Sequence, residues 1–192
     1  GALGVFFDYS HSGNGIKITE VIPGGPLDKA DIGIKAGMIL ERIDGELITP
    51  ELDFAKLLNR KADKFTLVEV IDPATQARKQ YTIKPISLGA ESQLLYKRWV
   101  KKNQEEVEKL SGGKLGYVHI PGMSDGPYRN VYEDMMGKYF EKEGVIVDTR
   151  FNGGGDLVAD LAMFFTGESF LTYATADKVV GGEPTALSLI HI

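Results

Sequence analysis

The sequence contains no cysteine among its 192 residues, which excludes disulfide bonds and thiol catalysis and leaves the redox compartment undetermined. Histidine is scarce as well, and His11, His119 and His191 are too far apart in the sequence for the spacing of metal ligands. We therefore expect neither a metal site nor a cofactor.

Long hydrophobic runs are also missing, since no stretch approaches the roughly 20 apolar residues that a helix needs to cross a bilayer. The formal net charge of −5 provides no electrostatic reason for binding nucleic acid. The chain begins at Gly1 with neither an initiator methionine nor a signal peptide, and we interpret it as a fragment. We expect a cytoplasmic protein, with a periplasmic or secreted parent as the alternative.

What the sequence does contain divides into two parts, of which the first, residues 1–88, is β-rich. The strand signals are runs of apolar and β-branched residues bounded by turn residues. They predict strands at Val5–Tyr9, Ile16–Ile22, Met38–Ile43, Phe65–Ile71 and Gln80–Ile86. Asn14 and Gly15 favour a hairpin between the first two strands. One helix is predicted at Glu51–Leu58 and a short helical turn at Leu27–Ala30.

The second part, residues 89–192, alternates helices with short apolar strands. A long amphipathic helix is predicted at Glu91–Leu110, followed by a strand at Leu115–Ile120. Ser124 or Asp125 is expected to cap the next helix, whose buried face carries several tyrosines and methionines. A buried strand at Val145–Thr149 then completes a βαβ series, so we expect a parallel α/β arrangement.

The most informative segment is the glycine turn after this last strand, Asn152-Gly153-Gly154-Gly155-Asp156, which leads into an apolar-periodic helix. A turn of this kind exposes backbone N–H groups that attract negative charge, either a phosphate or the oxyanion of an acyl-transfer intermediate. The turn lacks the G-x-G-x-x-G spacing of dinucleotide sites and the Gly-Lys-Ser/Thr ending of phosphate loops. Asp156 would in addition repel a phosphate, which argues against a phosphate site.

The first part resembles PDZ domains. Its opening, GALGVFF at residues 1–7, is similar to their carboxylate-binding loop, and residues 22–45 are similar to the PDZ core of processing proteases. The resemblance implies a PDZ-like β-barrel over residues 1–88 that binds a peptide as an added strand. The edge would be Val5–Tyr9, the other wall Glu51–Leu58, and the peptide-binding residues Leu3, Gly4, Val5, Phe6 and Phe7. The alternative is a PDZ fold that serves only as a spacer.

The second part resembles the C-terminal processing proteases. Residues 148–155, DTRFNGGG, are similar to their Asp-x-Arg-x-Asn-x-Gly-Gly signature, and residues 116–120 and 137–139 are closest to the tricorn protease branch. The resemblance implies the N-terminal half of a crotonase-like serine protease domain over residues 89–192. It also implies that a backbone amide of Gly154 or Gly155 helps to form the oxyanion hole, without deciding between them. Asp148 and Arg150 are expected to form a buried ion pair that braces the turn, and Asn152 to cap the helix or hold the turn.

The catalytic Ser, His and Glu of the family fall outside this segment, so the resemblance implies that the segment alone is inactive. Ser124, Ser169 and Ser188 lack the family's nucleophile pattern, and His119 is expected to be structural. The tail 186–192 is interpreted as foreign sequence, with the apolar strand that leads to the nucleophile as the alternative. The parent is thus expected to be a serine endopeptidase that acts on peptides or unfolded proteins and forms homo-oligomers. Two alternatives remain: a non-catalytic PDZ peptide-binding module and a crotonase-like acyl-CoA enzyme.

Overall fold

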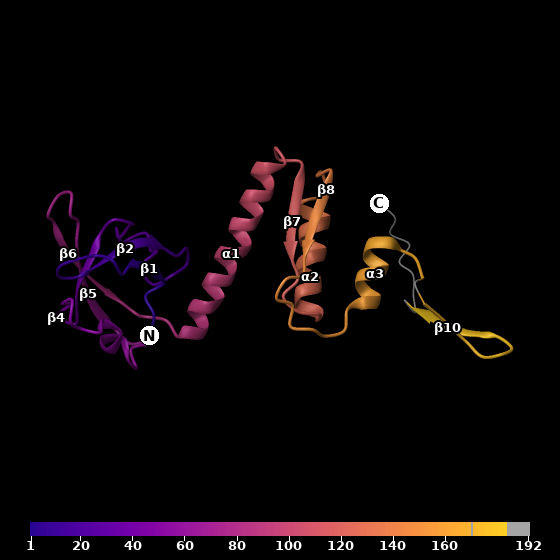
Figure 1. The fold of residues 1–192 in the computed structure, drawn as a ribbon, viewed down its shortest axis with the longest axis horizontal. Helices are drawn as coiled ribbons and strands as arrows, with labels where there is room; N and C mark the ends of the chain where they lie inside the picture. The colour runs from indigo at the N-terminus through magenta and orange to yellow at the C-terminus, as the bar shows by residue number, and fades with distance from the viewer. Residues whose placement is uncertain (170, 184–192) are drawn as a thin grey trace. The chain divides into compact units, whose positions relative to one another are not determined.

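The computed structural model describes residues 1–169 and 171–183, which divide into two compact units with the boundary between Lys101 and Lys102. The division falls inside the long helix α1 (Leu88–Leu110). The structure is of the mixed α and β type (Figure 1). Nowhere in the described segments is a helix both long and apolar enough to cross a membrane.

The amino-terminal unit is built on an antiparallel sheet in the order β1-β2-β3-β5-β6, with β4 paired to β3. The strands are β1 (Val5–Asp8), β2 (Ile16–Val21), β3 (Ile39–Ile43), β4 (Glu46–Leu47), β5 (Thr66–Ile71) and β6 (Arg78–Ile83). All five predicted strands are confirmed, with boundaries that differ by up to three residues. Their inward-facing residues form one apolar core, in which Ile18, Leu27, Leu40 and Val68 are fully buried. Strand β1 lies at the edge of the sheet, where one side of its backbone has no neighbour among the described strands.

The predicted helix at Glu51–Leu58 is shorter than expected. Only Phe54–Leu58 is helical, as the 3₁₀ helix η1, because the Asp53 carboxylate accepts a hydrogen bond from the Ala55 amide and starts the helix there. The predicted helical turn at Leu27–Ala30 is wrong. The Asp28 carboxylate instead accepts a bond from the Gly24 amide, which holds this segment as non-helical turns.

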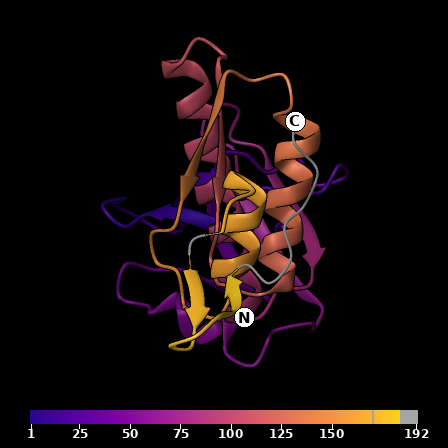
Figure 2. The same cartoon turned by 90° about the vertical axis from the view of Figure 1, so that its right-hand side faces the viewer.

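In the carboxyl-terminal unit, β7 (Leu115–His119) pairs in parallel with β8 (Gly144–Asp148), which confirms the predicted βαβ unit. The connecting helix α2 (Asp125–Glu133) continues into the π-helical turn η2 (Asp134–Lys138), and α3 (Val158–Thr166) follows β8. Figure 2 shows α3 beside α2, in agreement with the contact between the rings of Tyr132 and Phe164, 5.4 Å apart. Ser124 stands at the amino-terminal cap position of α2, although its side chain makes no capping hydrogen bond.

Alternation along β7 and β8 gives the strand pair two different faces. Val118, Ile120, Val145 and Val147 pack with α2 and α3 in a second apolar core. Tyr117 and His119 point to the opposite face, as the period of two residues in a strand requires. A last antiparallel pair, β9 (Leu171–Ala174) with β10 (Val179–Glu183), follows α3. The expected foreign tail, residues 186–192, lies outside the described residues.

Candidate functional site

The glycine turn lies between β8 and α3, as predicted, and three of its residues have positive φ angles. These are Phe151 at 60°, Gly154 at 88° and Gly155 at 126°. Glycine adopts such angles without strain, whereas an aromatic residue in this region costs on the order of 1–3 kcal/mol. Phe151 is nevertheless 87% exposed, so the surrounding bonds rather than its own packing must hold this conformation.

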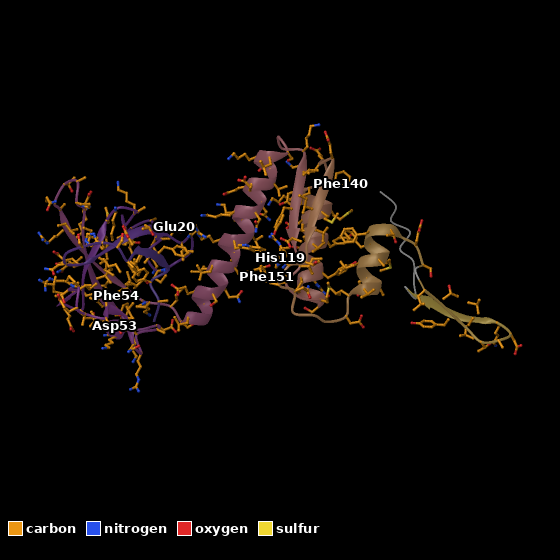
Figure 3. All side chains as sticks on the ribbon, viewed as in Figure 1. Glu20, Asp53, Phe54, His119, Phe140 and Phe151 are labelled. Carbon is orange, nitrogen blue, oxygen red and sulfur yellow. The ribbon has the colours of Figure 1, made fainter. Side chains whose placement is uncertain are left out.

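Those bonds join the turn to the segment that follows β7, at the ends of the two strands where Figure 3 labels His119 and Phe151. The Gly153 amide donates to the Pro121 carbonyl at 3.0 Å, and the Asp156 amide donates to the Met123 carbonyl at 3.0 Å. In return the Met123 amide donates to the Gly154 carbonyl at 2.8 Å. The two segments are thus tied by backbone bonds on both sides of Gly155, in a parallel bridge between Met123 and Gly155.

Asn152 holds the turn with both ends of its side-chain amide. Its Nδ2 donates to the Ile120 carbonyl at 2.8 Å, and its Oδ1 accepts from the Gly154 amide at 2.7 Å. The expectation that Asn152 either caps the helix or holds the turn is resolved in favour of the turn, since the cap position of α3 is Leu157. The Gly154 amide is therefore already engaged within the fold.

The Gly155 amide differs from its neighbours in the turn. The amides of Asn152, Gly153, Gly154 and Asp156 all have acceptors, whereas that of Gly155 has none among the described residues. Gly155 is also exposed to solvent. A β-carbon at this position would lie 2.1 Å from the Met123 carbonyl oxygen, so the backbone approaches too closely for any residue other than glycine.

Behind the turn, the Asp148 carboxylate at the end of β8 collects hydrogen bonds from two residues. Arg150 donates from its amide at 2.9 Å and from its guanidinium at 2.6–3.0 Å, and the Tyr117 hydroxyl donates at 2.6 Å. The guanidinium bonds hold the pKa of Asp148 well below its usual range, so the group is a carboxylate at neutral pH. Burial, followed by the bond to Asp148, raises the pKa of Tyr117 to about 12 and keeps its phenol protonated.

The predicted ion pair between Asp148 and Arg150 is confirmed, although only its carboxylate is buried. The side chain of Asp148 is 7% exposed and that of Arg150 is 61% exposed. Tyr117 was not anticipated as the third member of this group. Its position in the alternation of β7, opposite the buried Val118, was the available signal.

His119 lies on the same face of β7 as Tyr117, and its Nε2 lies 2.7 Å from the Arg150 carbonyl oxygen. Because a carbonyl only accepts, Nε2 carries the proton in this bond. The half-buried ring thus holds the backbone of Arg150, the residue just before the turn, which agrees with the expected structural role of His119. A hollow of about 440 Å³ lies on this face and is lined in part by Tyr117, Ile146 and Arg150.

A cavity of about 410 Å³ lies on the other side of the strands, away from the turn. It is lined mainly by apolar residues of α2, η2 and α3, among them Tyr132, Met136 and Phe164. The Lys142 ammonium in its lining donates to the Gly113 carbonyl at 2.7 Å, and the Thr166 hydroxyl donates to the Ala162 carbonyl at 2.8 Å. The chemistry suggested by the sequence belongs to the glycine turn and not to this cavity.

The residues predicted to bind a peptide lie in and before β1. Leu3 and Val5 are buried in the core, and Gly4 adopts a φ of 65°. The ring of Phe7 packs edge-on against Phe54 of η1, 5.2 Å away, so η1 directly adjoins β1. A β-carbon on Gly4 would lie 3.0–3.1 Å from Pro26 and Gly25, so any larger residue there perturbs the fold.

Comparison with known proteins gives the same assignment along most of the chain. The sequence profile of peptidase family S41 matches residues 114–180, which include β7, β8 and the glycine turn. A tricorn protease homolog of Saccharolobus solfataricus is 34% identical over 163 residues. The chain belongs to the tricorn-like proteases of peptidase family S41. A putative tricorn-like protease C-terminal subunit of Sulfurisphaera tokodaii is 32% identical over 164 residues.

The fold of this tricorn-like chain agrees as well. It superposes on the crystal structure of the tricorn protease with a TM-score of 0.72 at 23% identity, over 96% of this chain. The chain spans only a small part of these proteins: 14% of the Saccharolobus homolog, 18% of the Sulfurisphaera subunit and 18% of the tricorn chain. The aligned regions cover 81% of this chain in each of the two sequence relatives.

Proposed function

We propose that this chain is part of a serine endopeptidase that cleaves peptides through an acyl-enzyme, and that Gly155 supplies one amide of its oxyanion hole. The observation that carries the proposal is the amide of the exposed residue Gly155, which has no acceptor among the residues that the structure describes, although the other amides of the turn are bonded. A fixed amide of this kind stabilises the negative oxygen of a tetrahedral intermediate because it needs no rearrangement during the reaction. Membership in the tricorn-like family supports the same chemistry.

The structure also gives a reason to favour Gly155 over Gly154. A donor already bonded to Asn152 would have to lose a 2.7 Å hydrogen bond before it served an oxyanion. The Gly155 amide has no such bond to break, and the backbone bonds on either side of it keep its orientation constant. Asp148, Arg150, Tyr117 and His119 then act as positioning residues that hold the turn from behind.

We further propose that the amino-terminal unit is a PDZ-like domain, residues 1–88, whose edge strand β1 binds an extended peptide substrate. The support is an unpaired strand edge next to a helix wall and a glycine loop at its start. Backbone pairing along such an edge accepts many sequences, which suits a protease that processes varied peptides. The crotonase-like arrangement of residues 89–192 is proposed on the same family grounds.

The test of the oxyanion assignment uses the complete enzyme in complex with a peptide aldehyde. The hemiacetal oxygen is expected 2.7–3.1 Å from the Gly155 nitrogen and farther from that of Gly154. Alanine at position 155 keeps the N–H, but its β-carbon would clash with the Met123 carbonyl and turn the peptide plane. Gly155→Ala should therefore misalign the donor and lower kcat by roughly 10²–10³-fold, the scale of one oxyanion-hole donor. Gly154→Ala is the matched control, because it also has a positive φ but a β-carbon there meets no atom within 4 Å. An inhibitor oxygen bound elsewhere, with the Gly155 amide turned away from it, would refute the assignment.

The catalytic Ser, His and Glu are proposed to lie outside residues 1–192. The isolated chain should therefore not react with a fluorophosphonate probe, whereas the complete enzyme should. Labelling of the isolated chain would contradict this placement. If the complete protein also remained unlabelled but still bound peptides, it would be a non-catalytic PDZ module.

A further inference from the structure

The amino-terminal half of α1 packs against the loop that precedes β1, within the same compact unit. Glu91, in the first turn of the helix, accepts a hydrogen bond from the Gly4 amide through Oε1 at 3.3 Å. One turn later Leu94 approaches the Gly24 backbone, where a β-carbon would meet it at 3.4 Å. The loop amide that resembles a carboxylate site is thus already bonded to a carboxylate of the same chain.

Arg98, two turns beyond Glu91, holds the same face of α1 against the sheet. Its guanidinium forms two hydrogen bonds with the Glu20 carboxylate of β2 and lies 4.7 Å from the centre of the Phe6 ring in β1. Figure 3 labels Glu20 on the part of the sheet next to α1. Because Glu91 and Arg98 are seven residues apart, they share one face of the helix, and the contact at Gly4 is held by more than one weak bond.

The printed contacts of α1 with this region reach the Gly4 loop and the Phe6 side of β1. Phe6 faces α1, whereas Phe7 points the other way, into the core and against Phe54. A peptide added along the edge of β1 would therefore meet Glu91 only where its last residue reaches Gly4. At that point Glu91 would both occupy the amide and repel a negative chain end.

We propose that Glu91 is an internal ligand of the Gly4 loop, and that it competes with the terminal carboxylate of a bound peptide. The inference rests on the proposed peptide-binding function of the amino-terminal unit. A peptide with a free carboxylate binds only in the fraction of molecules in which Glu91 has left Gly4, which lowers its apparent affinity by that fraction. A peptide without a terminal charge gains little from the Gly4 amide and is less affected.

The test compares the wild-type chain with Glu91→Ala and with Asp31→Asn, an exposed position that removes the same charge from the same unit. Two pools of fluorescein-labelled octapeptides, randomised in the last four positions, are titrated by fluorescence polarisation. One pool ends in a free carboxylate and the other in an amide. Glu91→Ala should tighten binding of the acid pool roughly tenfold, the scale of one hydrogen bond to a charged group, and of the amide pool less than about twofold. Asp31→Asn should leave both unchanged.

The hydrogen bond between Gly4 and Glu91 is tested separately by NMR, from the ¹H and ¹⁵N chemical shifts of the Gly4 amide in the absence of peptide. These should change in Glu91→Ala and not in Asp31→Asn. Unchanged Gly4 shifts, or equal binding of the acid pool to wild type and Glu91→Ala, would overturn the inference while leaving peptide binding intact. If the Gly4 shifts change in Glu91→Ala but neither peptide pool binds to the wild type or to a variant, this unit does not bind peptides. The proposed competition by Glu91 would then be refuted as well.

Discussion

At the scale of single residues, the site depends on polar side chains that satisfy the backbone of a strained turn. Asn152 serves one carbonyl and one amide, and Asp148 takes up the amide and guanidinium of Arg150. Each of these side chains gives polar groups of the turn a hydrogen-bond partner within the fold. The Gly155 amide has no such partner among the described residues, which makes it the candidate donor to a substrate oxygen.

Replacement of Asp148 by asparagine tests the support behind the turn. We expect Asp148→Asn to lower the free energy of unfolding at pH 7 by about 2 kcal/mol, because Tyr117 and Arg150 lose a buried charged acceptor. The folded-state pKa of this carboxyl is lowered, so its stabilisation is complete above the pKa of an unfolded aspartate, about 3.9, and fades as the pH falls further.

Urea unfolding at pH 7 and pH 3 measures the effect. The difference in free energy of unfolding between wild type and Asp148→Asn should be about 1 kcal/mol smaller at pH 3 than at pH 7. The reason is that the wild type loses part of the stabilisation from the Asp148 charge at the lower pH. Glu141→Gln, at an exposed position, is the matched control and should change little at either pH. A difference that is the same at both pH values would show that the charge of Asp148 contributes nothing.

At the scale of elements, the π-helical turn η2 is explained by the packing of the residue that follows it. The Tyr139 amide bonds to the Asp134 carbonyl at 2.8 Å, five residues back. This wider turn brings the buried Tyr139 ring over Gly116 of β7, where a β-carbon would lie 2.5 Å from the ring. The helix that connects the two strands therefore ends by docking on the first of them.

Gly116→Ala should consequently destabilise the chain by about 1–3 kcal/mol through overpacking against Tyr139. Gly126→Ala in α2 is the control, because no atom lies within 4 Å of its β-carbon, and it should be neutral or stabilising by up to about 1 kcal/mol. Urea unfolding followed by circular dichroism provides the measurement. In a Tyr139→Ala background the same Gly116→Ala change should cost little. An equal cost in both backgrounds would exclude the ring contact as the cause.

At the scale of the whole molecule, the two units have separate apolar cores that share no residue. One is gathered around the antiparallel sheet and includes Ile18, and the other surrounds β7 and β8 and includes Ile120. Cores without common members stabilise their own units, so local opening is expected to follow the unit boundary.

Ile18→Ala should lower the stability of the amino-terminal unit by about 2–5 kcal/mol, and Ile120→Ala that of the carboxyl-terminal unit by a similar amount. Hydrogen exchange read by mass spectrometry separates the two cases. Ile18→Ala should speed exchange in β1–β6 and spare β7 and β8, and Ile120→Ala should do the reverse. If either variant accelerated exchange equally in both units, the molecule would unfold as one body.

Residue type and periodicity were sufficient for much of this protein. They predicted five of the six strands of the first unit, the long helix α1, the parallel βαβ unit and the turn before α3, because alternation and turn residues act locally. They missed the two-residue strand β4. The family signature likewise predicted the pair of Asp148 and Arg150, whose partners lie two residues apart.

Only the tertiary structure decided which amide of the glycine turn lacks an acceptor in the part of the chain that is described. Gly154 and Gly155 look alike in sequence. In the structure the Gly154 amide donates to Asn152, whereas Gly155 forms a backbone bridge with Met123 that leaves its own amide without an acceptor among the described residues. The same holds for Tyr117 at Asp148 and for Glu91 at Gly4, which are 31 and 87 residues apart. Such pairings depend on how strands and helices pack, and a local pattern carries no information about the distance between residues so remote along the chain.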